Sequence, residues 1–236
     1  MRQLTLRDSS LSQASRKLLA SAFRPPTAIR AGADIVLQGH RPEHCTLVVS
    51  GWACRYSDLP DGRRQTLALH ISGDFVDLHS FPIKVMDHSV RALTECSVAT
   101  VSHALVRGIT EVDPHLSRLL WLHTLIDASI LRQWLLSAAQ RSALEHTAHL
   151  VCELFTRLQA VGLAVPGRSF SLPISQQEFA VALGISAVHL SRTMAELRSR
   201  NLFVWKSAEA EILDWPGLSK LAEFDPAYLI LKDEPR

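Results

Sequence analysis

The sequence has 236 residues, of which 47% are hydrophobic, and 25 lysines and arginines stand against 23 acidic residues. Such a chain is long and apolar enough to form one large globular domain or two smaller ones. Its net charge of +2 excludes a strongly basic or acidic protein, so a nucleic-acid or membrane partner has to be argued from local clusters of charge.

The four cysteines indicate a reducing environment. Cys45, Cys54, Cys96 and Cys152 are widely spaced and form no C-x-x-C pair, which favours free thiols over a disulfide framework or an iron-sulfur cluster. The N-terminal segment lacks the apolar core of a signal peptide, and no run of about 18 apolar residues follows it. We therefore expect a cytoplasmic protein that does not enter a membrane.

The region from about residue 29 to residue 102 has the pattern of short antiparallel strands. Four segments separated by turn residues carry this pattern: DIVLQG, CTLVVSGWACRYS, RRQTLALHIS and SVRALTECSVATVS. In the third segment Leu67, Leu69 and Ile71 share one face of a strand, and Asp61-Gly62 before it is typical of a hairpin turn. The spacing predicts a small antiparallel barrel or roll.

A long helix is predicted after Asp113-Pro114, an aspartate cap followed by a proline suited to a first turn. The following segment, HLSRLLWLHTLIDASILRQWLLSAA, has apolar residues on two sides, so both sides must be buried. One side consists of Leu116, Leu119, Leu120, Ile126, Ile130 and Trp134, and the other of Trp121, Leu122, Leu125, Leu135 and Leu136. We expect one side to contact the roll and the other a second subunit, and we assign the first set to the dimer interface. Burial of both sides within one chain is the alternative.

A second helix is predicted from about residue 142 to Gly162, and a loop with a short strand follows it in VPGRSFSLPIS. The helical spacing is carried by Leu144, Ala148, Val151, Leu154, Phe155 and Leu158. His146, His149 and Cys152 also lie on this helix. Residues spaced three apart point in successively different directions around a helix. The three side chains therefore do not converge on one ion, and we predict no metal site there.

Two short helices separated by a glycine come next. Ser175-Gln176-Gln177-Glu178 is an S-x-x-E capping box that starts the first helix, and Gly184 is suited to the left-handed conformation that ends it. Ser186 can then cap the second helix. Close packing of the two helices is favoured by Ala180, Ile185, Leu190 and Leu197. This arrangement predicts a helix-turn-helix.

The second helix of this pair is basic, with Arg192, Arg198 and Arg200 against Glu196. A recognition helix enters the DNA major groove with its N-terminal residues near the base edges. For Arg192 the sequence leaves open whether it bonds guanine or a phosphate. The full set of predicted DNA-binding residues is Ser175, Gln176, Gln177, Ser186, Ala187, Val188, His189, Ser191, Arg192, Arg198 and, on a following hairpin, Lys206. A helical hairpin with a solvated basic face is the structural alternative.

With these residues in place, the chain resembles the Crp/Fnr family of bacterial transcription regulators over nearly its whole length. Four motifs carry the resemblance in the family's order: GADIVLQG, VSGWACRY, ISGDFVDLHSF and ALGISAVHLSRTMAELRSRNLF. The resemblance implies an α+β fold. Its parts are a cyclic-nucleotide-binding-type β-roll over residues 1–112, a dimerisation helix over 113–141 and a winged helix-turn-helix over 142–236. It also implies a homodimer, a palindromic double-stranded DNA operator and RNA polymerase as a further partner.

The sequence departs from the family where cyclic AMP is bound. Leu78 stands near the position of the glutamate that binds the ribose, and His88-Ser89 stands where an arginine-serine pair would bind the phosphate. A neutral histidine is a poor substitute for a guanidinium fork, and Arg91 replaces its charge only in part, so we expect cyclic AMP binding to be absent or weak. The predicted effector pocket consists of Gly73, Asp74, Asp77, Leu78, His79, His88, Ser89 and Arg91. A metal or pH-sensitive site at Asp77, His79 and His88 is an alternative, but we predict neither a metal nor a cofactor.

Two further departures concern sensing and the operator. No cysteine precedes Cys45, which argues against the iron-sulfur centre of the oxygen-sensing members. Val188 stands where well-known members read a G·C pair with a glutamate, whereas Ser191 and Arg192 match the family, so we expect a related but different half-site.

Nothing in the sequence predicts an enzyme, because it contains no G-x-S-x-G, G-x-x-x-x-G-K-[ST] or H-E-x-x-H motif. We expect a dimeric, sequence-specific DNA-binding transcription regulator. The alternatives are a ligand-binding protein-interaction module without DNA binding and a constitutive regulator whose pocket is filled by side chains.

Overall fold

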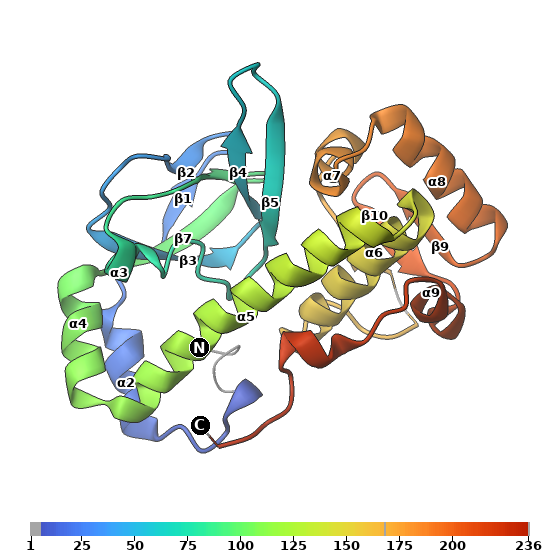
Figure 1. Ribbon diagram of the computed structural model, residues 1–236. Helices are drawn as coiled ribbons and strands as arrows, with labels where there is room; N and C mark the ends of the chain where they lie inside the picture. The colour runs from blue at the N-terminus through green and yellow to red at the C-terminus, as the bar shows by residue number, and fades with distance from the viewer. Residues whose placement is uncertain (1–5, 168, 236) are drawn as a thin grey trace.

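The protein has the α+β fold that the sequence predicts. The computed structural model describes residues 6–167 and 169–235. Figure 1 shows an antiparallel β-roll, a long helix α5 (Pro114–Gln140) that crosses the molecule, and a helical C-terminal region with a small sheet. Within the described part of the chain, no helix is both long and apolar enough to span a membrane.

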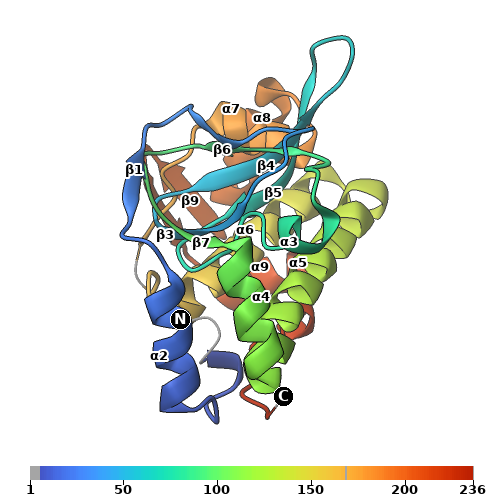
Figure 2. The same ribbon diagram turned by 90° about the vertical axis from the view of Figure 1, so that its left-hand side faces the viewer.

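The roll consists of two antiparallel sheets, which Figure 2 shows from the side of the roll. One sheet has the strand order β1-β7-β3 and the other the order β2-β6-β4-β5. The strands are β1 Thr27–Ile29, β2 Asp34–Val36, β3 His44–Ser50, β4 Ala53–Asp58, β5 Arg64–His70, β6 Ser89–Ala92 and β7 Cys96–Ser102. Val48, Val90 and Val98 belong to one buried cluster of the roll. The predicted antiparallel roll is confirmed, with β1 as an additional short strand.

The hairpin of β4 and β5 has the turn that the sequence predicts. The strands pair from Ala53 with His70 to Asp58 with Arg64, and the register shifts between Arg55 and Tyr56. At the tip, Asp61 Oδ1 accepts a hydrogen bond from the Arg63 backbone at 3.0 Å, and Gly62 has a φ of 84°. This hairpin extends beyond the rest of the roll in Figure 2.

Gly51, just after β3, occupies a position with room for no side chain. Its φ is 92°, and an added Cβ would lie 2.4 Å from the Glu95 carbonyl oxygen. We expect Gly51→Ala to lower the free energy of unfolding by about 2–3 kcal/mol, because the strained φ and the backbone collision both act against folding.

The matched control for this prediction is Gly62→Ala. Gly62 has a similar φ of 84°, but nothing lies within 4 Å of an added Cβ, so we expect a cost of only about 1 kcal/mol. Urea unfolding of both variants measures the difference. Equal costs would show that the contact with Glu95 does not constrain this turn.

Three helices around the roll go beyond the sequence prediction. They are α2 Gln13–Ala22, α3 Ser80–Ile83 and α4 His103–Val112. Ser12 caps α2, and Ser102 caps α4 by accepting a hydrogen bond from the Leu105 backbone. Because α4 leads directly into α5, the helical region begins at His103 and not, as expected, at Asp113.

One side of α5 is buried within the chain itself. Asp113 caps the helix and Pro114 lies in its first turn, as predicted. The buried residues are Leu116, Leu119, Leu120, Ile126, Ile130 and Trp134. The first three pack in a cluster with α2 and α4, and the last three pack with the roll and the C-terminal region. Their assignment to a dimer interface is therefore corrected, because the chain's own core already covers these side chains.

The opposite side of α5 carries large apolar residues that the chain leaves uncovered. They are Trp121, Leu125, Leu131, Leu135 and Leu136. Burying one such side chain on association is worth about 1.5–3 kcal/mol, so this side of the helix is the one suited to a second copy.

The C-terminal region contains two helix pairs and a small antiparallel sheet of order β8-β10-β9. Its elements are α6 Ala143–Ala160, β8 Phe170–Ser171, α7 Gln176–Leu183, α8 Ala187–Ser199, β9 Phe203–Lys206, β10 Glu209–Ile212, α9 Trp215–Leu221 and the 3-10 helix η1 Pro226–Leu229. A capping box of Ser142 and Glu145 starts α6. The predicted helix after residue 142 and the short strand that follows it are both present; the division into 1–112, 113–141 and 142–236 stays a prediction.

The roll and the C-terminal region share one hydrophobic core. Trp52, Leu69 and Ile71 from the roll belong to the same buried cluster as Leu154 and Leu158 of α6. A direct hydrogen bond adds to this contact, because Gln65 Nε2 of β5 donates to the Val181 carbonyl of α7 at 3.2 Å. The helix-turn-helix region is therefore packed against the roll.

Candidate nucleic-acid interface and sensor pocket

Helices α7 and α8 form the predicted helix-turn-helix. Ser175 Oγ accepts a hydrogen bond from the Glu178 backbone at 3.1 Å, and Glu178 Oε2 accepts one from the Ser175 backbone at 2.7 Å. Gly184 ends α7 in the left-handed conformation with a φ of 67°. Ser186 Oγ accepts from the His189 backbone at 3.2 Å and so starts α8. The predicted capping box, glycine turn and second cap are all confirmed.

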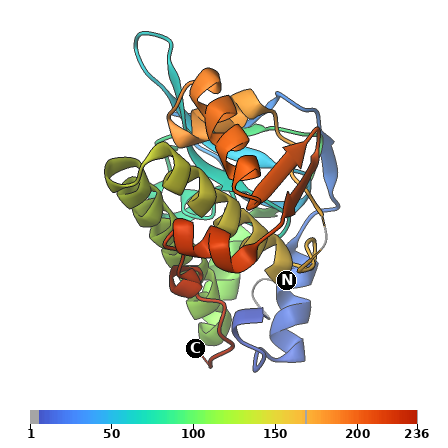
Figure 3. The same cartoon turned by 90° about the vertical axis from the view of Figure 1, so that its right-hand side faces the viewer.

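The outer face of α8 is exposed and basic. Its exposed residues include Ser186, Val188, His189, Ser191, Arg192, Arg198 and Arg200, whereas Ala187 is half-buried. Arg200 pairs with Glu196, while Arg192 and Arg198 have no ion-pair partner among the residues that the structure describes. Figure 3 shows α7 and α8 in orange, at the end of the molecule away from α2 and α4. Two unpaired guanidinium groups on an exposed helix suit phosphate oxygens or guanine acceptors.

The start of α8 also presents an uncovered apolar side chain. Val188 is 64% exposed, one position before His189 and in the first turn of the helix. A lone apolar side chain here has no folding role that the structure shows. It suits contact with a thymine methyl group at a groove floor.

Two neighbouring elements offer further polar groups. Ser175, Gln176 and Gln177 are exposed at the N-terminus of α7. Lys206 is exposed at the end of β9, opposite Glu209 in the β9–β10 hairpin, which is the predicted wing. Their contacts with phosphates stay a prediction.

The predicted effector residues do not gather into one pocket. Asp77 accepts hydrogen bonds from the Thr46 backbone and from Thr46 Oγ1, and burial raises its pKa to about 7. Leu78 packs in the core beside Cys45. The Gly73 backbone donates to Val48 of β3 at 2.8 Å. These three residues of the predicted pocket therefore serve the packing of the roll.

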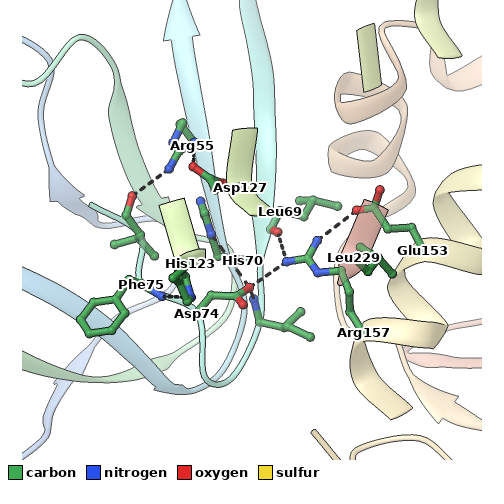
Figure 4. Close-up of polar contacts among 12 residues, drawn as sticks. Arg55, Leu69, His70, Asp74, Phe75, His123, Asp127, Glu153, Arg157 and Leu229 are labelled. Atoms are coloured by element: carbon green, nitrogen blue, oxygen red, sulfur yellow. Dashed lines mark hydrogen bonds and ion pairs between the residues drawn. The ribbon is translucent and has the colours of Figure 1, made fainter. Parts of the chain in front are cut away.

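Asp74 takes part in a buried ionic network that joins the roll to α6. Arg157 Nη2 lies 2.7 Å from Asp74 Oδ2 and donates to the Leu69 carbonyl at 2.8 Å, while Arg157 Nη1 lies 3.1 Å from Glu153 Oε1. Figure 4 shows Arg157 between the roll and Glu153. Tyr228 from η1 and Trp134 from α5 both donate to Glu153. The Asp74 carboxylate is used by this network, and it also lines a cavity with His123 of α5, so its assignment to an effector pocket stays a prediction.

A second ion pair joins the roll to α5. Arg55 Nη1 of β4 lies 2.7 Å from Asp127 Oδ2, and Arg55 Nη2 donates to the Val76 carbonyl at 3.1 Å. Burial, together with the Arg55 charge, lowers the pKa of nearby His70 to about 3. His70 is therefore neutral over the physiological range, and the ionic connection to α5 depends on Arg55 and Asp127.

Ser89 and Arg91 are occupied within the roll. Ser89 Oγ accepts a hydrogen bond from the Gln38 backbone at 2.9 Å. Arg91 Nε lies 3.3 Å from Asp34 Oδ1, which also accepts a hydrogen bond from Tyr56 at 2.8 Å. The charge of Arg91 is thus already balanced by Asp34, so it does not replace the missing phosphate-binding arginine.

His79 and His88 are the effector residues that the structure does bring together. Their ring centroids are 4.9 Å apart, and His88 Nδ1 lies 2.7 Å from Asp87 Oδ1. Burial and the Arg55 charge lower the pKa of both rings, that of His88 to about 4, so both are neutral near pH 7. Asp77, which the sequence grouped with these histidines, is bonded to Thr46 instead.

The Arg157 network and the Arg55–Asp127 ion pair, which connect the parts of the molecule, are not predicted from the sequence. The sequence does contain a sign of the Arg157 network, because Glu153 and Arg157 stand four residues apart on an otherwise apolar helix. His149 of the same helix has a structural role, because its ring bonds the Ala222 carbonyl at 3.1 Å and Tyr228 at 3.3 Å. All four cysteines are free and buried.

Two protein-family models match parts of the chain. Residues 26–113 match the cyclic nucleotide-binding domain, and residues 145–221 match the Crp-like helix-turn-helix domain. The first match lies on the roll and α4, and the second runs from α6 to α9.

Similar proteins are known from several bacteria. The chain is 28% identical to the nitrogen fixation regulation protein FixK of Rhizobium meliloti strain 1021, over 80% of each chain. It is 24% identical to the transcriptional activator protein FnrA of Stutzerimonas stutzeri, over 90% of this chain and 86% of that one. Its fold is similar to that of FixK2 from Bradyrhizobium japonicum, with a TM-score of 0.76 and 24% identity over 83% of this chain and 96% of that one.

Proposed function

Because the chain belongs to the Crp/Fnr family of bacterial transcription regulators, we propose that it is a homodimeric, sequence-specific DNA-binding regulator acting in the cytoplasm. The exposed basic face of α8 carries this proposal. Val188, His189 and Ser191 face the base edges of a major groove, and Arg192 binds a guanine or a phosphate beside them. Arg198, the start of α7 and Lys206 contact phosphates on either side of the groove.

Dimerisation uses the uncovered side of α5. Trp121 and Leu135 are 66% and 70% exposed, and a second copy of the helix would remove both from water. A groove of about 530 Å³ runs from Leu135 to His189 at the start of α8. A partner on α5 therefore lies next to the recognition helix. A twofold axis at this contact places the two α8 helices so that each binds one half-site of a palindrome.

Regulation acts through the contact between the roll and the helix-turn-helix. The shared core and the Arg157 network hold α6 against the roll, so a change in the roll alters the pose of α7 and α8. Cyclic AMP is not the effector, because Ser89 and Arg91 are engaged by Gln38 and Asp34 and no arginine replaces His88. RNA polymerase is the expected protein partner at promoters.

Replacing Arg192 with alanine tests the DNA interface. On a duplex selected by the protein from a random-sequence pool, we expect the affinity to fall by about 1–3 kcal/mol, or roughly 5- to 150-fold. If the guanidinium binds a phosphate, the slope of log affinity against log salt also falls by about 1, because one counterion fewer is released. Fluorescence anisotropy over a range of salt concentrations measures both quantities.

The matched control is Arg107→Ala, an exposed arginine on α4 that lies outside the helix-turn-helix. It should leave both affinity and salt slope unchanged. If the parent binds DNA without salt dependence, or if Arg192→Ala binds as the parent does, α8 is not a DNA-binding helix. That result would favour a ligand-binding protein-interaction module.

A further inference from the structure

We propose that His79, Asp87 and His88 form a binding site on the roll for a divalent transition-metal ion such as Zn²⁺. One ligand atom from each of the three residues lies within 4.8 Å of the other two. A tetrahedral zinc ion with bonds of about 2.0–2.1 Å separates its ligands by roughly 3.3 Å. To close this group around an ion, the Asp87 carboxylate has to leave the Nδ1 atom of His88, which lies 2.7 Å from it, and its exposed side chain has room to move.

The two imidazole rings have unsatisfied nitrogen atoms inside the protein. His88 is 6% exposed, and the Nε2 atoms of His79 and His88 are both buried without a hydrogen-bond partner among the described residues. Buried polar atoms of this kind are rare because each one costs about 1–3 kcal/mol. Two of them on adjacent rings indicate a missing ligand that binds nitrogen lone pairs.

The backbone holds the ligands in place before an ion arrives. His79 caps the short helix α3, where the Ile83 backbone donates to the His79 carbonyl at 3.1 Å. Two residues before His88, the Met86 carbonyl accepts a hydrogen bond from the Gly39 backbone at 2.8 Å, and the Met86 backbone donates to the His40 carbonyl at 2.9 Å. The backbone is thus held in a helical turn at His79 and bonded to the Gly39–His40 segment near His88, which lowers the entropy cost of bringing the ligands together.

The charges and the access also suit a cation. Asp87 supplies one negative charge, and its side chain is 74% exposed, so the site opens to solvent at that edge. Arg55 is a positive charge that acts on both rings, but Asp127 at 2.7 Å from it balances this charge. Two imidazoles and one carboxylate with an open position favour Zn²⁺, Co²⁺, Ni²⁺ or Fe²⁺ over Mg²⁺ and Ca²⁺, which prefer oxygen ligands.

Titration of the metal-free, full-length protein with Co²⁺ tests the site without any use of DNA. We expect a visible d–d absorption band that saturates at one ion per chain, that Zn²⁺ abolishes and that excess Mg²⁺ leaves unchanged. His79→Gln and His88→Gln should each weaken Co²⁺ binding by more than about 10-fold. Absence of the band in the parent protein would overturn the proposal.

Two control variants separate ligand loss from misfolding or binding elsewhere. Asp87→Asn removes the charge of an exposed side chain but keeps an oxygen that can accept the hydrogen bond from His88, so we expect it to weaken Co²⁺ binding while the melting temperature of the metal-free protein stays the same. His40→Gln removes an exposed histidine outside the site and should bind Co²⁺ as the parent does. Parent-like binding by Asp87→Asn, or equal losses in His40→Gln and His88→Gln, would contradict the three-residue site.

Discussion

Replacing Arg157 with leucine is expected to lower the free energy of unfolding by about 3–5 kcal/mol, the largest effect of any single substitution considered. Arg157 is 8% exposed and bonds Asp74, Glu153 and the Leu69 carbonyl. Without the guanidinium, two carboxyl groups stay buried with their main counter-charge removed. Urea unfolding at a fixed protein concentration measures the loss, because the stability of a dimer depends on concentration.

Removing a charge from the exposed Arg200–Glu196 pair is the control for this prediction. Both side chains of that pair are about half exposed, so we expect Arg200→Leu to cost less than about 0.5 kcal/mol. Adding Asp74→Asn to Arg157→Leu should restore part of the lost stability, since it neutralises one of the two buried carboxylates that the Arg157 guanidinium had bound. Costs of similar size in Arg157→Leu and Arg200→Leu would mean that the buried network contributes little.

The cost of Arg157→Leu should also depend on pH. Although burial by itself raises the pKa of Asp74, the Arg157 charge holds it below its usual value in the parent. The stability that Asp74 contributes is therefore present above its unfolded pKa of about 3.9 and lost as the pH falls through the folded value. In the variant, burial raises the Asp74 pKa, so its ionisation opposes folding as the pH rises. We expect the difference between parent and variant to shrink from about pH 7 to about pH 4.

Placing glutamates at Trp121 and Leu135 together is expected to convert the proposed dimer to a monomer. These two side chains are the most exposed large apolar residues of α5, and a charge on each would have to be buried without a partner at the interface. Because each monomer holds only one recognition helix, its affinity for a palindromic duplex should fall by about 100-fold or more. Light scattering after size exclusion measures the mass, and anisotropy measures the affinity.

Leu163→Glu is the control for the dimer variant. Leu163 is 54% exposed and follows α6, where it lines a groove with Trp52 and Leu158 and not with α5, so its variant should stay dimeric and bind DNA as the parent does. A double variant that stays dimeric would show that the copies associate elsewhere. A monomeric variant with parent-like affinity would show that DNA binding does not need two recognition helices.

The helix-turn-helix could be predicted from the sequence because its signals are local. The Ser175 capping box, the left-handed Gly184 and the Ser186 cap each lie within a few residues of the group they bond. The hairpin turn at Asp61-Gly62 is local in the same way. Short helices such as α3 carry too few residues to show a period, and α4 was missed although Ser102 marks its start.

The two sides of α5 show what sequence periodicity leaves undecided. The pattern correctly indicates two apolar sides, but it does not say which one faces the chain's own core. That choice depends on α2 and α4, which pack against Leu116 and Leu119. Charged residues at Leu119 or Ile126 would therefore test folding, not dimerisation.

The effector residues could not be placed for a similar reason. The partner of Asp74 is 83 residues away at Arg157, and no local pattern links the two. The resemblance to cyclic-nucleotide-binding proteins indicates that His88 stands where a phosphate-binding arginine would, and this stays a prediction. The alternative site at Asp77, His79 and His88 correctly brought the two histidines together, but it did not anticipate that Asp77 bonds Thr46 instead.

The hydrophobic cluster common to the roll and α6 has a consequence for protein engineering. Grafting the helix-turn-helix onto a foreign sensor would uncover Trp52, Leu69 and Ile71 on one fragment and Leu154 and Leu158 on the other. Both fragments would then expose hydrophobic patches of the kind that drive aggregation. Chimaeras of this regulator should therefore exchange α8 residues alone, in place, and leave the rest of the chain intact.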